Sequence, residues 1–389
     1  MNISILGPIN SEDIRNIFKV NSNLPKGHGH SHLPYLAKGL LELKCKITLI
    51  SLSDDIDENF TININDNLKI IFCPLRKNAF RIKKFQIGRM MDFFKKERMF
   101  LLSAIKTSNP DFIISNWTYE YALASLKSKF KSLIVIHDIP LKVFLIQKSI
   151  YKFFRLLMSI YVFLKSSKIM VSNSNYTKKN IFFKKKILKT IYLPLPSFLR
   201  KKNIFAKKKK EIIVISSGGL GKIKNIEKTI LAFNLIKKKY DFKLKLIGQD
   251  LEYNGKYYHL FKHLGYDLKK IMFMGFLPHK KVMIEIEKSY ILLHTSQEES
   301  FGNIFIEAMA CGTPIVAGRS VGAVKEVIKN YGLLVDINNI DEISKALTKY
   351  INNNEYYKLK RRKAYNYVFR KFNYKDISKQ YMSLINKVK

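Results

Sequence analysis

The stretch from Tyr290 to Gly318 constrains the fold more than any other part of the chain. It reads YILLHTSQEESFGNIFIEAMACGTPIVAG. An apolar run typical of a buried strand comes first, a polar loop follows, and apolar residues at helical spacing predict a short helix that ends at Gly312. A second apolar run, Ile315 to Ala317, comes after the turn. This order predicts part of a doubly wound parallel sheet, which binds ligands at the carboxyl ends of its strands.

Two glutamates flank the start of this predicted helix. Glu299 lies in the loop before it and Glu307 lies about one turn into it, so both carboxylates can face the same crevice. Gly302 and Asn303 begin the helix, where free N–H groups and the helix dipole favour an anion such as a phosphate. Carboxylates accept charge-assisted hydrogen bonds from sugar hydroxyls. The combination suits a nucleotide sugar, whereas the spacing alone is also typical of two solvated surface glutamates.

The segment ESFGNIFIEAMACGTPIVA, Glu299 to Ala317, resembles the signature of the family 4 (group 1) retaining glycosyltransferases. That signature is a pair of glutamates at fixed spacing, a helix and a Gly-x-Pro turn. The resemblance implies that Glu307 binds the nucleotide ribose, that Glu299 contacts the donor, and that the backbone between them lies near the diphosphate. The donor-binding residues that it implies in this segment are Glu299, Ser300, Phe301, Gly302, Asn303, Ile304 and Glu307.

The length and composition of the chain limit its possible domain number and compartment. A chain of 389 residues is long enough for two domains. Its first residues resemble a strand rather than a signal peptide. The three cysteines, Cys45, Cys73 and Cys311, are scattered and odd in number, which favours a reducing compartment and no metal site.

The net charge of +40 is extreme for an enzyme. Nucleic acid and an anionic membrane surface would both be attracted by it. Codon bias is the third explanation, because lysine, asparagine and isoleucine are all abundant. Neither a recognition helix, a zinc ligand set nor an aromatic platform is evident, so we expect no nucleic-acid partner. Membrane attraction and codon bias both stay open.

The first half begins like an α/β domain. A strand at 2–6, the loop GHGHSH at 27–32, a helical pattern and a strand at 47–52 follow one another. This order resembles the family's opening, in which a glycine pair approaches the ligand; Gly27 keeps the first glycine and His28 replaces the second. We interpret the loop as the acceptor-side rim. A metal site at the alternating His28, His30 and His32 is disfavoured, because no carboxylate or cysteine is near.

Further strands are expected at 68–73, 111–115, 133–137 and 169–172, and the helical patterns between most of them predict a parallel sheet. His137 and Asp138 end the predicted strand in the run LIVIHDIP. The resemblance implies that His137 lies near the donor sugar and the acceptor; a capping or packing role is the alternative.

Two basic and aromatic segments, 80–100 and 141–168, could contact a membrane. The longest uncharged run in the second, Leu156 to Leu164, is far shorter than the roughly 20 residues that span a bilayer. A basic amphipathic helix can instead lie in the interface. We expect peripheral binding to an anionic membrane, with ordinary packing on the sheet as the alternative.

The second half contains a phosphate-binding pattern. KKNIFAKKKK, residues 201–210, is typical of a linker, and a strand at 212–216 then leads into SSGGLGKIKN. Glycines let backbone approach phosphate and lysines neutralise it, which makes Gly218, Gly219, Lys222 and Lys224 donor-binding candidates. The family has an arginine and a lysine here: Lys224 matches the lysine, Gly219 replaces the arginine, and Lys222 is the candidate to compensate.

One aromatic residue completes the predicted donor site. MFMGFLPHKKV resembles the family segment that flanks the base, with Phe276 as its candidate and core packing as the alternative.

The resemblance implies an α/β chain of two Rossmann-like parallel-sheet domains facing a cleft, the GT-B fold. The expected domains are residues 1–200, a linker at 201–210, residues 211–365, and a helix at 366–389 that crosses back to the first domain. The resemblance also implies retention of anomeric configuration without a metal. We expect no cofactor, with Lys222, Lys224 and the helix start stabilising the leaving diphosphate. The expected catalytic residues are His137, Glu299 and Lys224.

The predicted function is retaining transfer of a hexosyl group from a nucleotide sugar to a glycan or lipid-linked acceptor in lipopolysaccharide or capsule synthesis. We expect a cytoplasmic protein, peripheral on the inner face of the cell membrane. Two alternatives stay open: a non-catalytic binding or scaffold protein, which Gly219 favours, and a nucleotide-sugar epimerase of the same architecture.

Overall fold

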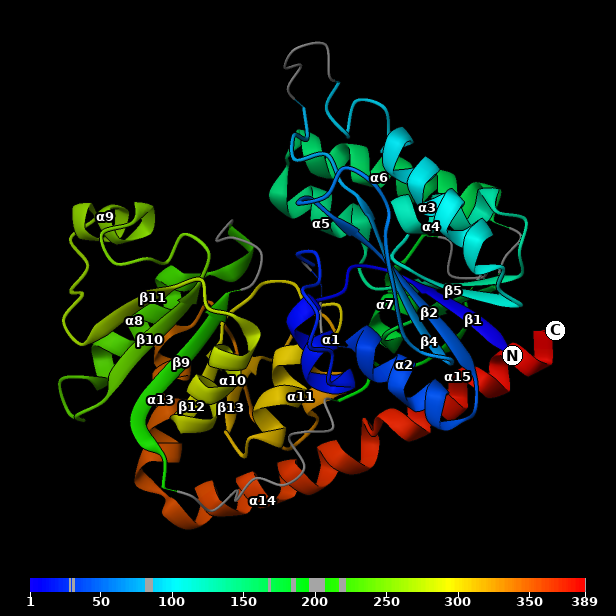
Figure 1. Ribbon diagram of the computed structural model, residues 1–389. Coiled ribbons are helices and arrows are strands. Elements are labelled where there is room, and N and C mark those ends of the chain that lie inside the picture. Colours follow the sequence, from blue (N-terminus) through cyan, green and yellow to red (C-terminus); the bar gives the residue numbers. More distant parts are fainter. Residues whose placement is uncertain are drawn as a thin grey trace. The chain divides into compact units, whose positions relative to one another are not determined.

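The computed structural model describes residues 1–27, 29, 32–80, 87–166, 169–182, 187–195, 207–216 and 222–388. The chain divides into two compact units, Met1–Pro196 with Phe372–Lys389, and Ser197–Lys371 (Figure 1). Each unit is a largely parallel sheet covered by helices. The predicted α/β class with two parallel-sheet domains is confirmed.

The first unit is built on an eight-stranded sheet in the order β3-β4-β2-β1-β5-β6-β7-β8. Its central strands are buried along most of their length, as their apolar runs require. The strands are β1 (Asn2–Leu6), β2 (Lys46–Ser53), β3 (Phe60–Asn65), β4 (Leu68–Pro74), β5 (Phe112–Asn116), β6 (Ser132–Ile136), β7 (Ile169–Ser172) and β8 (Ile187–Thr190).

One edge of this sheet departs from the prediction. β3 pairs antiparallel with β4, so the expectation of a purely parallel sheet is wrong there. The two strands form a hairpin, and Asn67 N–H donates to Asn65 Oδ1 in its turn at 2.9 Å. Side chains of β3 alternate between half-buried and exposed, which is the pattern of an edge strand.

Helices cover both faces of the first sheet. One face carries α3 (Lys95–Ser108), α4 (Glu120–Lys127), α5 (Pro140–Gln147) and α6 (Ile150–Lys165), and the other carries α1 (Ser11–Phe18), α2 (His32–Glu42) and α15 (Tyr374–Val388). The short α7 (Asn175–Asn180) contacts β7 and β8.

The C-terminal helix α15 packs on α2 of the first unit. Ile377 and Tyr381 are buried in the same core as β1 and β2. The helix before it, α14 (Asn354–Lys371), belongs to the second unit, so the unit boundary lies at Lys371 and Phe372 rather than at the predicted 365 and 366. Leu195 N–H donates to the Phe372 carbonyl at 2.8 Å beside this boundary.

The second unit has a six-stranded parallel sheet in the order β11-β10-β9-β12-β13-β14. β9 begins at Lys209, so the last two residues of the predicted linker are in a strand. Residues 201–206 of that linker lie outside the described residues. The strands are β9 (Lys209–Ser216), β10 (Lys243–Gly248), β11 (Ile271–Gly275), β12 (Ser289–His294), β13 (Ile315–Gly318) and β14 (Leu333–Val335).

Helices cover this sheet on both faces as well. On one side, α8 (Ile226–Ile236) and α13 (Ile340–Asn352) share one apolar core. On the other side, α10 (His279–Lys288) contacts α11 (Asn303–Ala310), and α11 contacts α14. α9 (Lys256–His263) and α12 (Val324–Ile328) complete the unit. The predicted helix start beside Gly302 and the helix at 226–236 are confirmed.

The packing of α15 on α2 predicts that one glycine-to-alanine substitution lowers the stability of the protein. A Cβ at Gly39 would lie 2.8 Å from Ser378 Cβ, which is closer than two carbons can approach. Alanine in place of a helical glycine normally stabilises, but here we expect Gly39→Ala to destabilise by about 1–3 kcal/mol. Urea unfolding measures it, and Ser378→Gly in a double-mutant cycle should recover part of the loss. A stabilising Gly39→Ala would contradict this packing.

Candidate functional site

The loop between β12 and α11 is tied to the segment before α8. Thr295 Oγ1 donates to the Lys224 carbonyl at 3.1 Å, and Ser296 Oγ donates to the Ile223 carbonyl at 3.1 Å. The Gln297 N–H also donates to the Ile223 carbonyl, at 2.7 Å. β9 and β12 are neighbouring parallel strands, so their carboxyl ends bring these two loops together. The result is one polar edge on the second sheet.

Glu299 lies at this edge between two basic side chains. Its Oε1 atom is 3.4 Å from Lys224 Nζ and 3.4 Å from His294 Nε2, and its side chain is 19% exposed. Burial favours the neutral carboxyl, but Lys224 and His294 outweigh burial and lower the pKa of Glu299 to about 2. Glu299 is therefore ionised at neutral pH and accepts hydrogen bonds; it has no proton to give.

The backbone of Glu299 is held by a second loop. The Ala323 N–H donates to the Glu299 carbonyl at 2.7 Å. Gly322 has φ of 46°, and a Cβ there would overlap the Glu299 carbonyl oxygen. Only glycine meets both conditions without strain. Gly322 therefore positions Glu299, although the sequence analysis did not assign it to the site.

The start of α11 is shaped by a left-handed glycine. Gly302 has φ of 84° and stands just before the helix, and a Cβ there would overlap the Phe305 ring. That ring packs against His294, with 4.8 Å between centroids. The first turn of α11, which carries Asn303 and Ile304, presents N–H groups that have no acceptor within the helix. This is the predicted anion-binding end, next to the Glu299 loop.

Glu307 is paired with a histidine from another helix. His279 Nε2 lies 2.9 Å from Glu307 Oε1, and the Glu307 side chain is only 8% exposed. His279 is the first residue of α10. Glu307 is therefore held by a specific partner and is not a solvated surface glutamate.

Phe276 follows β11 and is 75% exposed. Core packing, the alternative that the sequence left open, is therefore wrong. A ring this exposed is available for stacking with a ligand.

His137 lies in the first unit, at the end of β6. The Asn116 amide donates through Nδ2 to the Leu6 carbonyl at 3.0 Å, which turns its Oδ1 toward His137 Nε2 at 2.9 Å. Because that oxygen only accepts, His137 Nε2 carries a proton. The Trp117 ring stacks on the imidazole at 4.1 Å. His137 is thus a buried, fixed histidine.

Gly27 also lies in the first unit. Its N–H donates to Ser11 Oγ at 2.8 Å, and a Cβ there would overlap the Ile9 carbonyl. The structure thus brings Lys224 and Glu299 together and places them, the α11 start and Glu307 in the second unit, whereas Gly27 and His137 belong to the other unit.

Other predicted residues are described only in part. Gly218, Gly219, His28 and His30 lie outside the described residues. Lys222 begins a short 3₁₀ helix, Lys222–Lys224, and its side chain also lies outside them. Ser300 is partly exposed, and Phe301 is buried.

The sequence analysis missed His294 and His279. His294 ends a buried strand, and a polar residue at the carboxyl end of a parallel strand was an available signal. His279 opens α10 within the same segment as Phe276. His279 pairs with Glu307 from a different helix, and His294 pairs with Glu299 from the strand end just before its loop, so both pairings depend on the tertiary structure.

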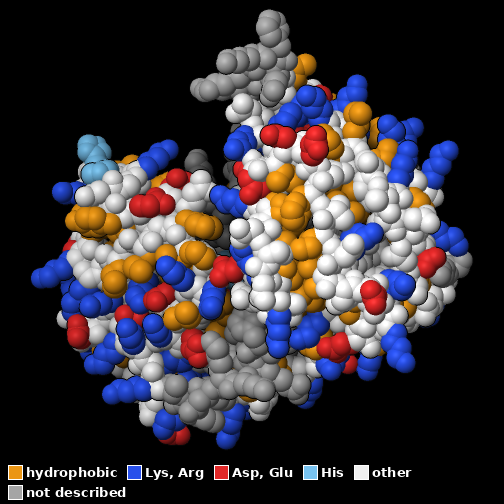
Figure 2. All heavy atoms as spheres, in the orientation of Figure 1, with side chains coloured by type: hydrophobic (Ala, Val, Ile, Leu, Met, Phe, Trp, Pro, Cys, Tyr) orange, Lys and Arg blue, Asp and Glu red, His pale blue; other side chains and the backbone are white. Residues whose placement is uncertain are grey.

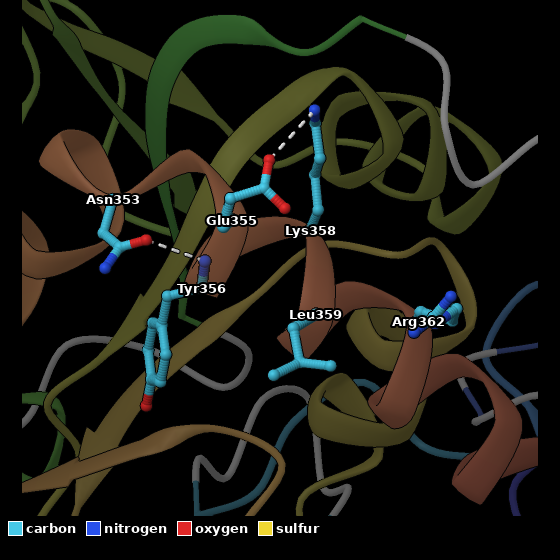
Figure 3. A pocket seen from close by; sticks show the side chains of 6 residues that line it. All are labelled: Asn353, Glu355, Tyr356, Lys358, Leu359 and Arg362. Atoms are coloured by element: carbon cyan, nitrogen blue, oxygen red, sulfur yellow. Dashed lines mark hydrogen bonds and ion pairs between the residues drawn. The ribbon is translucent and has the colours of Figure 1, made fainter.

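Two surface hollows lie outside this edge. One, of about 530 Å³, lies on α14 and the turn before it (Figure 3), where Tyr356 N–H donates to Asn353 Oδ1 at 2.8 Å and Lys358 pairs with Glu355 at 3.6 Å. It contains no predicted site residue. The other, of about 210 Å³, lies in the first unit beside Gly27.

Among the residues with described positions, His, Cys, Asp and Glu side chains form no group of three that could hold a metal ion. Nor does any described helix combine the length and apolar character needed to cross a membrane.

The second unit is similar to a known family. Residues 197–368, less than half of the chain, match the family model of the glycosyl transferases group 1. An uncharacterized glycosyltransferase of Methanocaldococcus jannaschii is 31% identical over 194 residues, which are 48% of this chain and 48% of that protein. The chain thus covers about half the length of the curated relatives it matches.

Solved structures extend the likeness from the glycosyl transferase domain to the whole fold. Sucrose-phosphate synthase from Thermosynechococcus elongatus is 17% identical with a TM-score of 0.76, covering 100% of this chain and 99% of that chain. The Anabaena protein HepE in complex with UDP-glucose is 15% identical with a TM-score of 0.65, covering 100% of both chains. The likeness shows the GT-B fold.

Ionised Glu299 predicts a pH-dependent stability difference. Its folded-state pKa of about 2 is below the ordinary 4.5, so its charge stabilises the folded unit above about pH 4.5, and this contribution is lost as the pH falls toward 2. Glu299→Gln should cost up to about 3 kcal/mol at neutral pH. Urea titrations between neutral and acidic pH should show the gap to wild type shrinking as the pH falls.

Glu355→Gln is the matched control, because its side chain is 88% exposed. It should change stability little at any pH. A wild-type to Glu299→Gln gap that is the same at acidic and neutral pH would contradict the ionised state.

Gly322→Ala tests the support of Glu299. The added methyl must displace the Glu299 backbone, so we expect a loss of about 1–3 kcal/mol in stability together with weaker nucleotide-sugar binding. Thermal unfolding with and without ligand measures both. Gly265→Ala is the control, since it also has positive φ but open space around it. Equal ligand affinity in the two variants would count against the positioning role.

Proposed function

We propose that this protein is a family 4 retaining glycosyltransferase that moves a hexosyl group from a nucleotide sugar to a glycan or lipid-linked acceptor. One observation carries the proposal: ionised Glu299 is held by Lys224 and His294 beside the start of α11, the helix that also carries Glu307. Two carboxylates that can accept hydrogen bonds from sugar hydroxyls thus lie on either side, in the sequence, of a helix start suited to a diphosphate. The family match of residues 197–368 supports the same activity.

The donor would be bound in three parts. Its diphosphate would accept hydrogen bonds from the backbone N–H groups at Gly302 to Ile304, and the positive charge of Lys224 would stabilise it. Its ribose would donate to Glu307, whose carboxylate His279 holds in place. Phe276, being exposed, is available for the base. HepE binds UDP-glucose in a protein of the same fold, which supports a nucleotide-sugar donor for this chain.

The chemistry proposed is front-face transfer without metal or cofactor. Departure of the diphosphate and attack of the acceptor would occur on one face of the sugar, with a donor phosphate oxygen taking the acceptor proton. Lys224 and the α11 start would stabilise the charge that develops on the diphosphate. A covalent glycosyl-enzyme trapped on Glu299 would overturn this version.

Glu299 and Glu307 do not suit the alternative of a glycosidase. That chemistry needs a carboxyl whose raised pKa keeps a proton for the leaving group. The pKa of Glu299 is lowered instead, to about 2. Glu299 is better suited to accept hydrogen bonds from the hydroxyls of the transferred sugar.

The acceptor side is assigned to the first unit. His137, fixed by Asn116 and Trp117, would lie near the donor sugar and acceptor, with Gly27 in the acceptor-side rim. Extreme basic charge favours an acceptor at an anionic membrane, so we propose a role in lipopolysaccharide or capsule synthesis on the cytoplasmic face.

A panel of nucleotide sugars tests the activity. A bound donor should raise the melting temperature by mass action, and an added acceptor should then release free nucleotide. Interconversion of two nucleotide sugars without transfer would point to an epimerase. Stabilisation with neither reaction would leave a binding protein, and either result would contradict the proposed transfer.

Glu307→Ala tests the ribose contact. Losing a charged hydrogen-bond acceptor should weaken nucleotide binding by about 1–3 kcal/mol, measured by calorimetry with the nucleoside diphosphate. Glu355→Ala, on the α14 surface, is the control and should bind like wild type. Unchanged nucleotide affinity in Glu307→Ala would remove the ribose role.

A further inference from the structure

One side of helix α6 carries an exposed apolar stripe. Its members recur at intervals of three, four or seven residues and are each at least 36% exposed: Ile150, Phe153, Leu157, Ile160, Tyr161 and Leu164. Ile150 and Leu164 are the most exposed, at 69% and 62%. We call these residues the α6 stripe. Large apolar side chains in a continuous row along a helix are unusual on a free surface and indicate a binding face.

The opposite side of α6 is fixed on the first unit. Met158 and Val162 are buried in the core against β6 and β7. Arg155 forms an ion pair with Glu120 at 2.6 Å and stacks over the Tyr119 ring at 3.6 Å. These contacts set the rotation of the helix, so the α6 stripe cannot turn inward. The apolar stripe is therefore additional to the core face.

The neighbouring helix α5 extends this surface. Phe144 of α5 packs against Phe153 of the α6 stripe with ring centroids 5.7 Å apart. Leu141 and Leu145 on α5 are 45% and 55% exposed. The apolar surface thus continues from one helix to the next.

Positive charge borders the α6 stripe. Lys148 precedes α6, Lys165 ends it, and both are exposed. The sequence has no aspartate or glutamate between Asp138 and Glu211, a span that includes both helices. Lysine and arginine side chains also outnumber carboxylates on the face shown in Figure 2. An apolar row with cations at its ends fits a bilayer whose headgroups are anionic.

We propose that the α6 stripe, with α5, is the surface by which this protein binds an anionic lipid bilayer. The stripe enters the headgroup and acyl boundary, while Lys148 and Lys165 contact lipid phosphates. The inference deepens the proposed function and rests on it for the lipid-linked acceptor. Tyr119, over which Arg155 of α6 stacks, also donates to Asp138 at 2.7 Å, so the bilayer surface is joined through two side chains to the residue after His137.

A second copy of the chain fits this surface less well. Two such faces would bring together segments that contain lysines and no carboxylates, and like charges across an interface oppose association. Lipid phosphates supply the missing negative charge. The charge therefore favours the bilayer as the occupant.

Vesicle co-sedimentation of the full chain tests the proposal. Wild type should bind vesicles that contain phosphatidylglycerol, bind phosphatidylcholine vesicles weakly, and lose binding as salt rises. Leu157→Glu/Leu164→Glu should weaken binding by about tenfold or more, because it puts carboxylates into the interface. The matched control is Leu260→Glu/Leu264→Glu, on α9 and directly after it, which adds the same charge to residues 42% and 55% exposed in the second unit.

A milder double substitution controls for the case in which the glutamate variant fails to fold. Lys148→Ala/Lys165→Ala leaves the apolar stripe intact and should reduce both the binding and its salt dependence. Failure of wild type to bind anionic vesicles would overturn the proposal, as would equal losses in the α6 and α9 variants. A vesicle-free dimer that Leu157→Glu/Leu164→Glu dissociates, without lipid binding, would assign the surface to a second copy instead.

The test also separates this surface from the donor site. Donor-induced stabilisation should be the same in wild type and in Leu157→Glu/Leu164→Glu, since α6 is in the other unit. Vesicle binding without stabilisation by any nucleotide sugar would count against the proposed transfer and leave the membrane surface standing. Donor binding without vesicle binding would do the reverse.

Discussion

The second unit depends on the contact between two loops at the carboxyl ends of β9 and β12. Backbone carbonyls of Ile223 and Lys224 accept hydrogen bonds from the loop that carries Glu299, and this places Lys224 Nζ against the Glu299 carboxylate. A carboxylate this little exposed would lose its charge without such partners. Because Lys224 and His294 keep it ionised, the same contact supplies both order in the loop and a negative group for a ligand.

The surrounding parts of the unit hold that group in position. Gly322 supports the Glu299 backbone, Phe305 packs under Gly302 and against His294, and His279 holds Glu307. Each support comes from a different element, so the site is fixed by tertiary packing. Such a site is pre-organised, which favours selective binding of one ligand geometry.

Local patterns predicted the parts of this arrangement that one segment determines. Residue spacing and the two glycines predicted that the helix begins at Gly302 and stops at Gly312, with Glu299 before it and Glu307 within it. The structure has these features. The pair of His279 with Glu307 could not be predicted, because its members lie on separate helices. The pair of His294 with Glu299 depends on the path of the loop after β12, which spacing alone does not determine. β3 was missed although its alternation was readable, since the three polar residues of FTININ hid a short edge strand. The predicted break at 365 fell inside α14, because neither glycine nor proline marks the true end at Lys371.

The most direct test of the account is a crystal structure of the full chain with a bound nucleoside diphosphate. The account predicts phosphate oxygens within hydrogen-bonding distance of the backbone N–H groups at Gly302 to Ile304, and ribose hydroxyls on the Glu307 carboxylate. A diphosphate bound elsewhere, with Glu299 and Glu307 contacting no part of the ligand, would contradict it.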